Sequence, residues 1–298
     1  MTKHLITQIR YQLQRQLKIK MNDSFNLTVS FIISPLLALL MALIFKSDPE
    51  LVYNAFYPNF LFFMLVTSIF FGLLSSVFEI IRDRTVIQRE RLGSISGLGY
   101  YVAKYLALSF FGLVQVILFN VVAALILHIE MPIVLFNSLI MYLLLLISIA
   151  MGLWVSSLSS TLLMASNFIP ILIIPQILLG GLIPYSEMDK ILFMGLGEES
   201  SVPIIAKIIP GKYAYESIIT GNVAFSSSVE EINDEISEIV GFSKSGGFMS
   251  LDVVEMALCD EGSLCTFKWF FNILVLIFYL SVLWILGYFT FKRRVYDA

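Results

Sequence analysis

Long runs of apolar residues without a charged side chain alternate along the chain with short charged segments. No Asp, Glu, Lys or Arg occurs in 51–78, in 105–127 or in 131–186. About 20 apolar residues in a helix cross the ~30 Å hydrocarbon core of a membrane. The longest run is 56 residues, too long for one helix, and its sequence SSLSST at 156–161 predicts a turn between two helices. The pattern therefore predicts an all-α fold with six membrane-spanning helices at 25–45, 59–81, 101–127, 133–155, 162–183 and 269–290.

The fifth predicted span differs from the others because it contains several polar residues and prolines. Asn167, Pro170, Pro175 and Gln176 all lie within it. Prolines are tolerated in membrane-spanning helices where neighbouring groups satisfy the freed backbone carbonyls. These prolines indicate either a bend or a local kink, and the sequence does not choose between the two.

The first 22 residues predict an amphipathic helix ahead of the first span. Leu5, Ile9, Leu13 and Leu17 recur at every fourth position, among Lys and Arg side chains. Such a helix lies in the interface of an anionic leaflet or packs on a partner protein. The segment has no continuous apolar core, so we do not expect a cleavable signal peptide.

The charged segment 82–98 follows the second span, and it is the most strongly charged stretch between two spans. It is basic, and one further charge, Glu79, lies at the end of the span before it. Each arginine would cost about 2.5–3.5 kcal/mol at the centre of a bilayer, so the segment lies at a membrane face. Apolar residues recur among the charges at roughly helical spacing, which leaves two interpretations open: a short helix on the membrane surface or a solvated loop.

Composition agrees with an integral membrane protein. Of 298 residues, 58% are hydrophobic and only 14% are charged, whereas soluble domains average about 25% charged residues. Charge is also distributed unevenly between the two sides that six spans define. Every arginine falls on one side, and the acidic segment 184–267 falls on the other. By the positive-inside rule, we expect a multi-pass protein of the cell (inner) membrane with both termini cytoplasmic and 184–267 outside.

The two cysteines, Cys259 and Cys265, both fall in this outer segment. A compartment that permits disulfides would let them pair, and two free thiols are the alternative.

The sequence also lacks the patterns of several other functions. It contains no phosphate-binding loop, no HExxH or GxSxG motif and no Cys/His cluster that would hold a metal. The predicted spans carry no charge at mid-bilayer, which argues against a proton- or cation-coupled carrier. We therefore expect no enzyme activity, no metal, no bound cofactor and no nucleic-acid partner for this chain.

Several short sequences, in order, resemble the membrane domains of ABC exporters of the G subfamily and their bacterial relatives. They are EIIRDR at 79–84, RER at 89–91, GYYVAK at 99–104, GGLIP at 180–184 and IPGKYAYE at 209–216. The resemblance runs from the amphipathic helix to the last span and identifies the chain as a single transmembrane domain, 1–298.

This resemblance implies a function and specific roles for residues. The charged segment would be the coupling helix that docks on an ATPase, with Arg82, Arg84, Arg89 and Arg91 docking and Glu79, Asp83 and Glu90 orienting them. Polar residues at the end of the second span would join a salt-bridge network with the amphipathic helix. Asn167, Pro170 and Gln176 would line the pathway, which the re-entrant outer segment caps.

The resemblance also implies partners for the chain. Two permease copies, identical or different, would pair in the lipid bilayer, and ATP and Mg would bind the partner ATPase. Since Met1 immediately precedes the amphipathic helix, the ATPase would be a separate subunit or a fused domain that has been removed. The expected function is ATP-driven export of a hydrophobic or amphipathic substrate. The alternative is a membrane scaffold or sensor whose acidic outer segment binds a ligand or partner.

The topology makes a direct prediction. A cysteine placed at Ser227, with Cys259 and Cys265 replaced, should react with an impermeant maleimide added to intact cells, because the acidic segment lies outside. A cysteine placed at Ser94 is the matched control and should react only after the membrane is permeabilised. Labelling at Ser94 with protection at Ser227 would reverse the topology.

Overall fold

The computed structural model describes residues 2–45, 57–92, 96–181, 205–225 and 265–296. Throughout these residues the secondary structure is helical, with no strand. Six helices are long and apolar enough to cross a membrane, which confirms the predicted all-α fold with six spans. Most of the acidic segment 184–267, including Cys259, lies outside the described residues, and so does the side chain of Cys265. The disulfide therefore stays a prediction.

The six long apolar helices follow the largely charge-free runs of the sequence, and shorter or charged helices lie between and beside them. In chain order, the helices are α1 (Thr2–Asn22), α2 (Ser24–Phe45), α3 (Tyr57–Ser76), α4 (Glu79–Leu92), α5 (Gly97–Leu127), α6 (Met131–Leu158), α7 (Leu162–Leu179), η3 (Ala206–Ile208), α8 (Pro210–Phe225), α11 (Cys265–Phe291) and η4 (Lys292–Tyr296). The segment for which the sequence allowed a loop or a helix is helical over Glu79–Leu92. Pro170 and Pro175 both lie inside the single helix α7.

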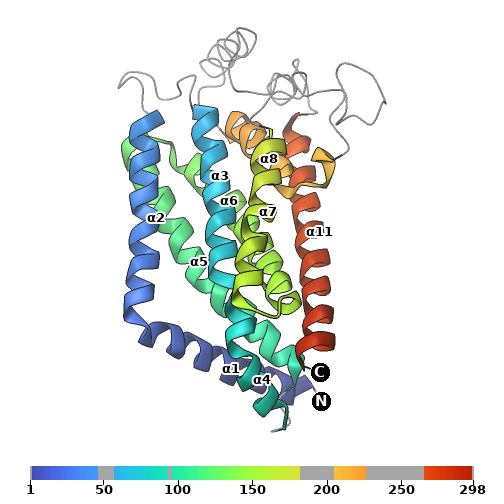
Figure 1. The fold of residues 1–298 in the computed structure, drawn as a ribbon. Coiled ribbons are helices and arrows are strands. Elements are labelled where there is room, and N and C mark those ends of the chain that lie inside the picture. The colour runs from blue at the N-terminus through green and yellow to red at the C-terminus, as the bar shows by residue number, and fades with distance from the viewer. Residues whose placement is uncertain (1, 46–56, 93–95, 182–204, 226–264, 297–298) are drawn as a thin grey trace.

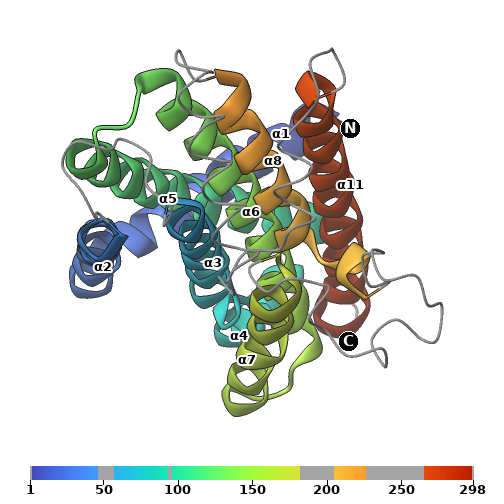
Figure 2. The ribbon, with the colours of Figure 1, turned by 90° about the horizontal axis from the view of Figure 1, so that it is seen from above.

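The arrangement gives the bundle two distinct ends. Figure 1 shows α1 lying across one end of the spans, beside α4 and both termini, while α8 lies at the opposite end. Figure 2 shows α6 inside the bundle, with α2, α7 and α11 at its periphery. The burial of the spans agrees with this view, because α3 and α6 are mostly buried and the three peripheral helices are mostly exposed.

Small residues allow α3 and α6 to approach closely at the centre of the bundle. A Cβ added to Gly72 would lie 2.5 Å from Ser148 Cβ, and one added to Gly152 would overlap the hydroxyl of Ser76. The four residues form two pairs spaced four apart, Gly72 with Ser76 and Ser148 with Gly152. This small-xxx-small spacing is typical of closely packed membrane helices.

A hydroxyl from α6 marks the break between α3 and α4. The Ser156 Oγ accepts hydrogen bonds from the backbone N–H groups of Ile80 and Ile81, at 3.1 and 3.3 Å. The first N–H groups of a helix have no partner within that helix. Ser156 thus caps α4 from a neighbouring helix and fixes where α4 begins relative to the core.

The close contact of α3 with α6 predicts that Gly152→Ala will destabilise the protein by about 1–3 kcal/mol, as overpacking does elsewhere. We expect a lower melting temperature for the purified protein, and Ser76→Gly in the same chain should recover part of the loss. Leu139→Ala, on the exposed side of the same helix, is the control and should melt like the wild type. An unchanged melting temperature in Gly152→Ala would contradict the observed packing.

Candidate functional site

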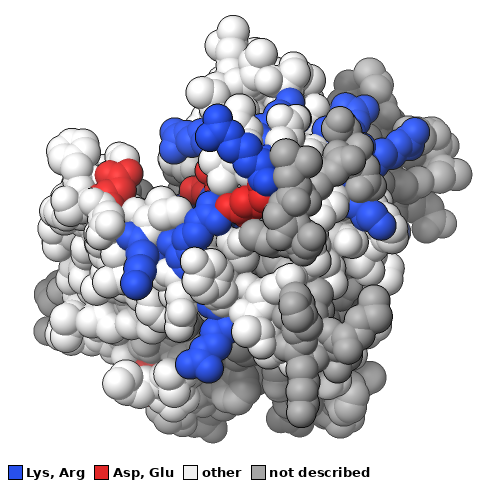
Figure 3. All heavy atoms as spheres, turned by 90° about the horizontal axis from the view of Figure 1, so that it is seen from below, with Lys and Arg blue, Asp and Glu red and all other residues white. Residues whose placement is uncertain are grey.

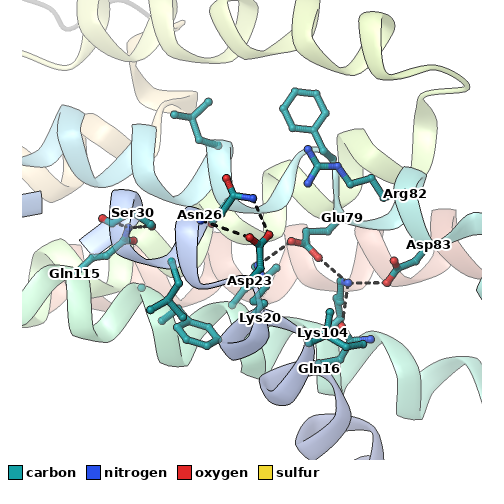
Figure 4. Close-up of a pocket in the computed structure, with 18 of the residues that line it drawn as sticks. Gln16, Lys20, Asp23, Asn26, Ser30, Glu79, Arg82, Asp83, Lys104 and Gln115 are labelled. Carbon is teal, nitrogen blue, oxygen red and sulfur yellow. Dashed lines mark hydrogen bonds and ion pairs between the residues drawn. The ribbon is translucent and has the colours of Figure 1, made fainter. Parts of the chain in front are cut away.

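A buried lysine joins three helices at the α1 end of the bundle. The Lys104 Nζ on α5 lies 2.6 Å from Glu79 Oε2 and 2.7 Å from Asp83 Oδ2, both on α4. It also donates a hydrogen bond of 3.1 Å to the Gln16 Oε1 of α1 (Figure 4). Only 3% of Lys104 is exposed. A buried ammonium is costly unless carboxylates and other acceptors surround it, and these three groups meet that requirement.

Two further ion pairs extend this cluster along α1. Lys20 Nζ lies 2.7 Å from Glu79 Oε1. Closer to the start of α1, Arg15 pairs with Glu90, which also accepts a hydrogen bond of 3.2 Å from Gln12 Nε2. The pairs therefore hold α4 to α1 at both ends of α4. We call Gln12, Arg15, Gln16, Lys20, Glu79, Asp83, Glu90 and Lys104 the polar cluster.

The polar cluster is the network that the resemblance implied between the end of the second span and the amphipathic helix. The resemblance also implied that Glu79, Asp83 and Glu90 orient the arginines of α4, and the structure shows which groups the acids contact. Glu79, Asp83 and Glu90 pair with α1 and α5 in the described structure, and not with the arginines of their own helix. They orient the whole helix α4, with one of its faces turned toward the bundle.

The arginines of α4 separate into different environments. Arg89 is exposed, and Arg82 is exposed with its guanidinium 5.6 Å from the centre of the Phe78 ring. Arg84 is half-buried and donates a hydrogen bond of 3.3 Å to the Ser159 carbonyl in the α6–α7 connection. Arg84 is therefore turned toward the bundle, and the side chain of Arg91 lies outside the described residues.

Basic side chains dominate the surface at this end of the molecule. Figure 3 looks at the α1 end and shows many Lys and Arg with a few Asp and Glu between them. Arg82, Thr85, Val86 and Arg89 of α4 are all exposed and spaced as one helical stripe, which we call the outward stripe, and Arg82 and Val86 at its α3 end also border the space between α4 and α2. A partner that approached from this end would meet this stripe.

The three residues expected to line a pathway do not share one environment. Asn167 and Pro170 are exposed on α7, whereas Gln176 is buried. Its Oε1 accepts a hydrogen bond of 3.0 Å from the Gly211 N–H in the first turn of α8. Because that N–H has no partner within α8, Gln176 caps the helix from outside, and this contact gives Gln176 a structural role.

A second buried polar group lies at the opposite end of the bundle. The Asn222 Nδ2 of α8 donates to the Asn137 Oδ1 of α6 at 2.8 Å, and the Tyr57 hydroxyl of α3 donates to the Asn222 Oδ1 at 3.1 Å. These bonds join α8 to the two most buried spans. This network could not be predicted from the sequence, because uncharged polar residues are scattered through every span.

Sequence reasoning also missed Lys104 as a site residue. A signal existed, since Lys104 is the single charge between residues 92 and 127 and lies near the start of a span. An ionisable residue in that position usually has a specific partner. Its partners could not be chosen from the sequence, because the choice depends on how α1 lies against α4 and α5.

Comparison with known families gives one match. The family model described as ABC-2 type transporter matches residues 7–221, which include most of α1, the polar cluster and most of α8. The chain belongs to the ABC-2 type transporter family. It is a multi-pass membrane protein and the permease component of an ABC transporter. Membership implies association with an ABC ATPase, because permeases of this family are transport subunits without ATPase motifs. A comparison with curated proteins gave no match.

No group of three or more His, Cys, Asp or Glu residues that could hold a metal ion occurs in the described parts of this ABC-2 permease. The side chains of the polar cluster instead form ion pairs and hydrogen bonds with one another.

The polar cluster makes a prediction about stability. Lys104→Met should lower the free energy of unfolding by up to about 3 kcal/mol, because it leaves two half-buried carboxylates without their shared cation. Adding Glu79→Gln and Asp83→Asn to the same chain should restore part of that loss. Melting temperatures of the purified proteins measure both effects, with Lys18→Met, an exposed lysine of α1, as the control. Equal melting of the single and triple variants would contradict the pairing.

Proposed function

We propose that this permease works in an ATP-driven exporter and that a separate ATPase subunit docks on the outward stripe of α4. The observation that carries the proposal is the two-sided character of α4. One side is fixed to α1 and α5 through Glu79, Asp83 and Glu90, while the other side exposes Arg89. A helix held in this way can pass a displacement at its exposed side directly to the spans.

The proposal assigns docking to the far end of α4. Arg84 is engaged with the α6–α7 connection, and Arg82 lies beside Phe78 at the membrane end of the helix. Arg89 and Arg91 remain as the arginines of the docking surface. Guanidinium groups form forked hydrogen bonds with carboxylates, which lysine does not reproduce.

The remaining parts of the proposal follow from family membership and charge. Two permease copies, identical or different, form the pathway in the inner membrane, with both termini and α4 on the cytoplasmic side. The transported molecule is hydrophobic or amphipathic, as the apolar spans favour. No observation on the described residues favours the alternative of a scaffold or sensor, because the acidic segment on which it rests is not described.

The test is the double variant Arg89→Ala with Arg91→Ala. We expect normal insertion, and recovery of the co-purifying ATPase from native membranes to fall by about tenfold or more, since each close charge pair contributes about 1 kcal/mol or more at such interfaces. Transport per inserted molecule should fall with it.

The control is Arg293→Ala with Arg294→Ala, which removes two exposed arginines from the same end of the bundle. If arginines only determine topology, both double variants should behave alike and every inserted molecule should transport normally. Wild-type transport in the Arg89/Arg91 variant would end the docking proposal. Absence of any ATPase in the wild-type pull-down would end the proposal of a separate subunit.

A further inference from the structure

A cavity of about 430 Å³ lies beside the polar cluster, between α1, α2, α3, α4 and α5. Figure 4 shows its polar side chains, with Lys20, Glu79, Arg82 and Lys104 grouped at one end and Ser30 and Gln115 farther along. Apolar side chains complete the wall, among them Leu27, Phe31, Leu74 and Phe111. The cavity is therefore amphipathic, with a charged end at the level of α1 and an apolar end that runs between the spans.

The cavity exists because α2 and α3 contact each other at only one end. At the far end, the rings of Phe45 and Phe63 stack at 5.7 Å, and Thr67 contacts Met41. Toward the α1 end, α2 is held instead to α5, where the Gln115 Nε2 donates to the Ser30 Oγ at 2.6 Å. The N-terminal half of α2, which follows Asp23, is therefore separated from α3, and the cavity lies between them.

Arg82 is the cation of the wall that favours an anion. The wall contains four cationic side chains and three carboxylates, but Arg15 is paired with Glu90, and Lys20 and Lys104 are paired with Glu79 and Asp83. Arg82 contacts the face of the Phe78 ring and has no carboxylate partner among the described residues. Asp23, the carboxylate nearest α2, is engaged by the Asn26 amide at 2.6 Å.

A buried donor at the same end also lacks an acceptor. The Nε2 of Gln16 is buried and makes no hydrogen bond to a described group, although Gln16 lines the cavity. Leaving such a donor unsatisfied costs about 1–3 kcal/mol. A phosphate oxygen is an acceptor of the required kind, and Arg82 and Lys20 are cations of the same cavity wall.

We infer that the cavity binds an anionic phospholipid from the leaflet at the α1 end. The phosphate lies near Arg82, Lys20 and Gln16, and one acyl chain follows Leu74 and Phe31 between α2 and α3. An acyl chain explains the apolar wall, which a free phosphate would leave without a contact. The inference goes beyond the proposed function, because it holds whether or not the bound lipid is transported.

The test is native mass spectrometry of the purified protein with phosphatidylglycerol and phosphatidylcholine of equal chain length. The wild type should retain phosphatidylglycerol preferentially, and glycerol phosphate, which has no acyl chain, should not bind. Arg82→Gln should weaken phosphatidylglycerol binding about fivefold, the contribution of one cation near an anionic headgroup. Arg89→Gln, which removes the same charge from the same helix outside the cavity, is the matched control.

A second pair of variants tests the acyl chain. Leu74→Trp should weaken retention of both lipids by narrowing the apolar end. Phe70→Trp, one turn away on α3, should not weaken retention, because Leu74 lines the cavity and Phe70 does not. The two positions are equally exposed, Leu74 at 43% and Phe70 at 42%. The inference fails if Arg82→Gln and Arg89→Gln bind alike, or if phosphatidylcholine binds the wild type as tightly as phosphatidylglycerol.

Discussion

The buried ammonium of Lys104 is the interaction on which the α1 end of the molecule depends. Only 3% of Lys104 is exposed, so its positive charge must be neutralised locally. Glu79 and Asp83 of α4 supply the negative charges that do so. The Gln16 amide then brings α1 to the same point. A single charge on α5 thus sets the position of a surface helix and of the helix that follows α3.

The remaining contacts of α4 make this position rigid. Ser156 caps its first turn from α6, and Arg84 reaches the carbonyl of Ser159 on the connection that follows α6. Because α6 packs on α3 through Gly72 and Gly152 without room for a methyl group, α4 is tied to the most closely packed pair of spans. A displacement of α4 must therefore move α6 or break these bonds, which is what a coupling element requires.

The sequence predicted the spans well because burying charge in hydrocarbon is so unfavourable that charge-free runs mark them directly. The same cost placed the α4 segment at a membrane face, whereas a docking role for it came from the family resemblance and stays a prediction. The sequence could not assign the partners of the acids. Arg82 and Arg89 are close to the acids in sequence, whereas the observed partners, Lys104, Lys20 and Arg15, are close to them in the folded structure. The role of Gln176 was also ambiguous from the sequence. A polar residue in a span can line a transport pathway or cap a neighbouring helix, and in the structure Gln176 caps α8.

The polar cluster and the cavity share residues, so a change in one alters the other. Glu79, Asp83 and Lys104 belong to the cluster, and the same side chains form the charged wall of the cavity. Any movement of α4 that separates the acids from Lys104 also rearranges that wall and exposes uncompensated charge to whatever occupies it. An anionic headgroup near Arg82 would then experience a different field, because charges within the Debye length and partly shielded from water interact strongly. Position of α4 and affinity for an anion in the cavity are consequently linked through the same ion pairs.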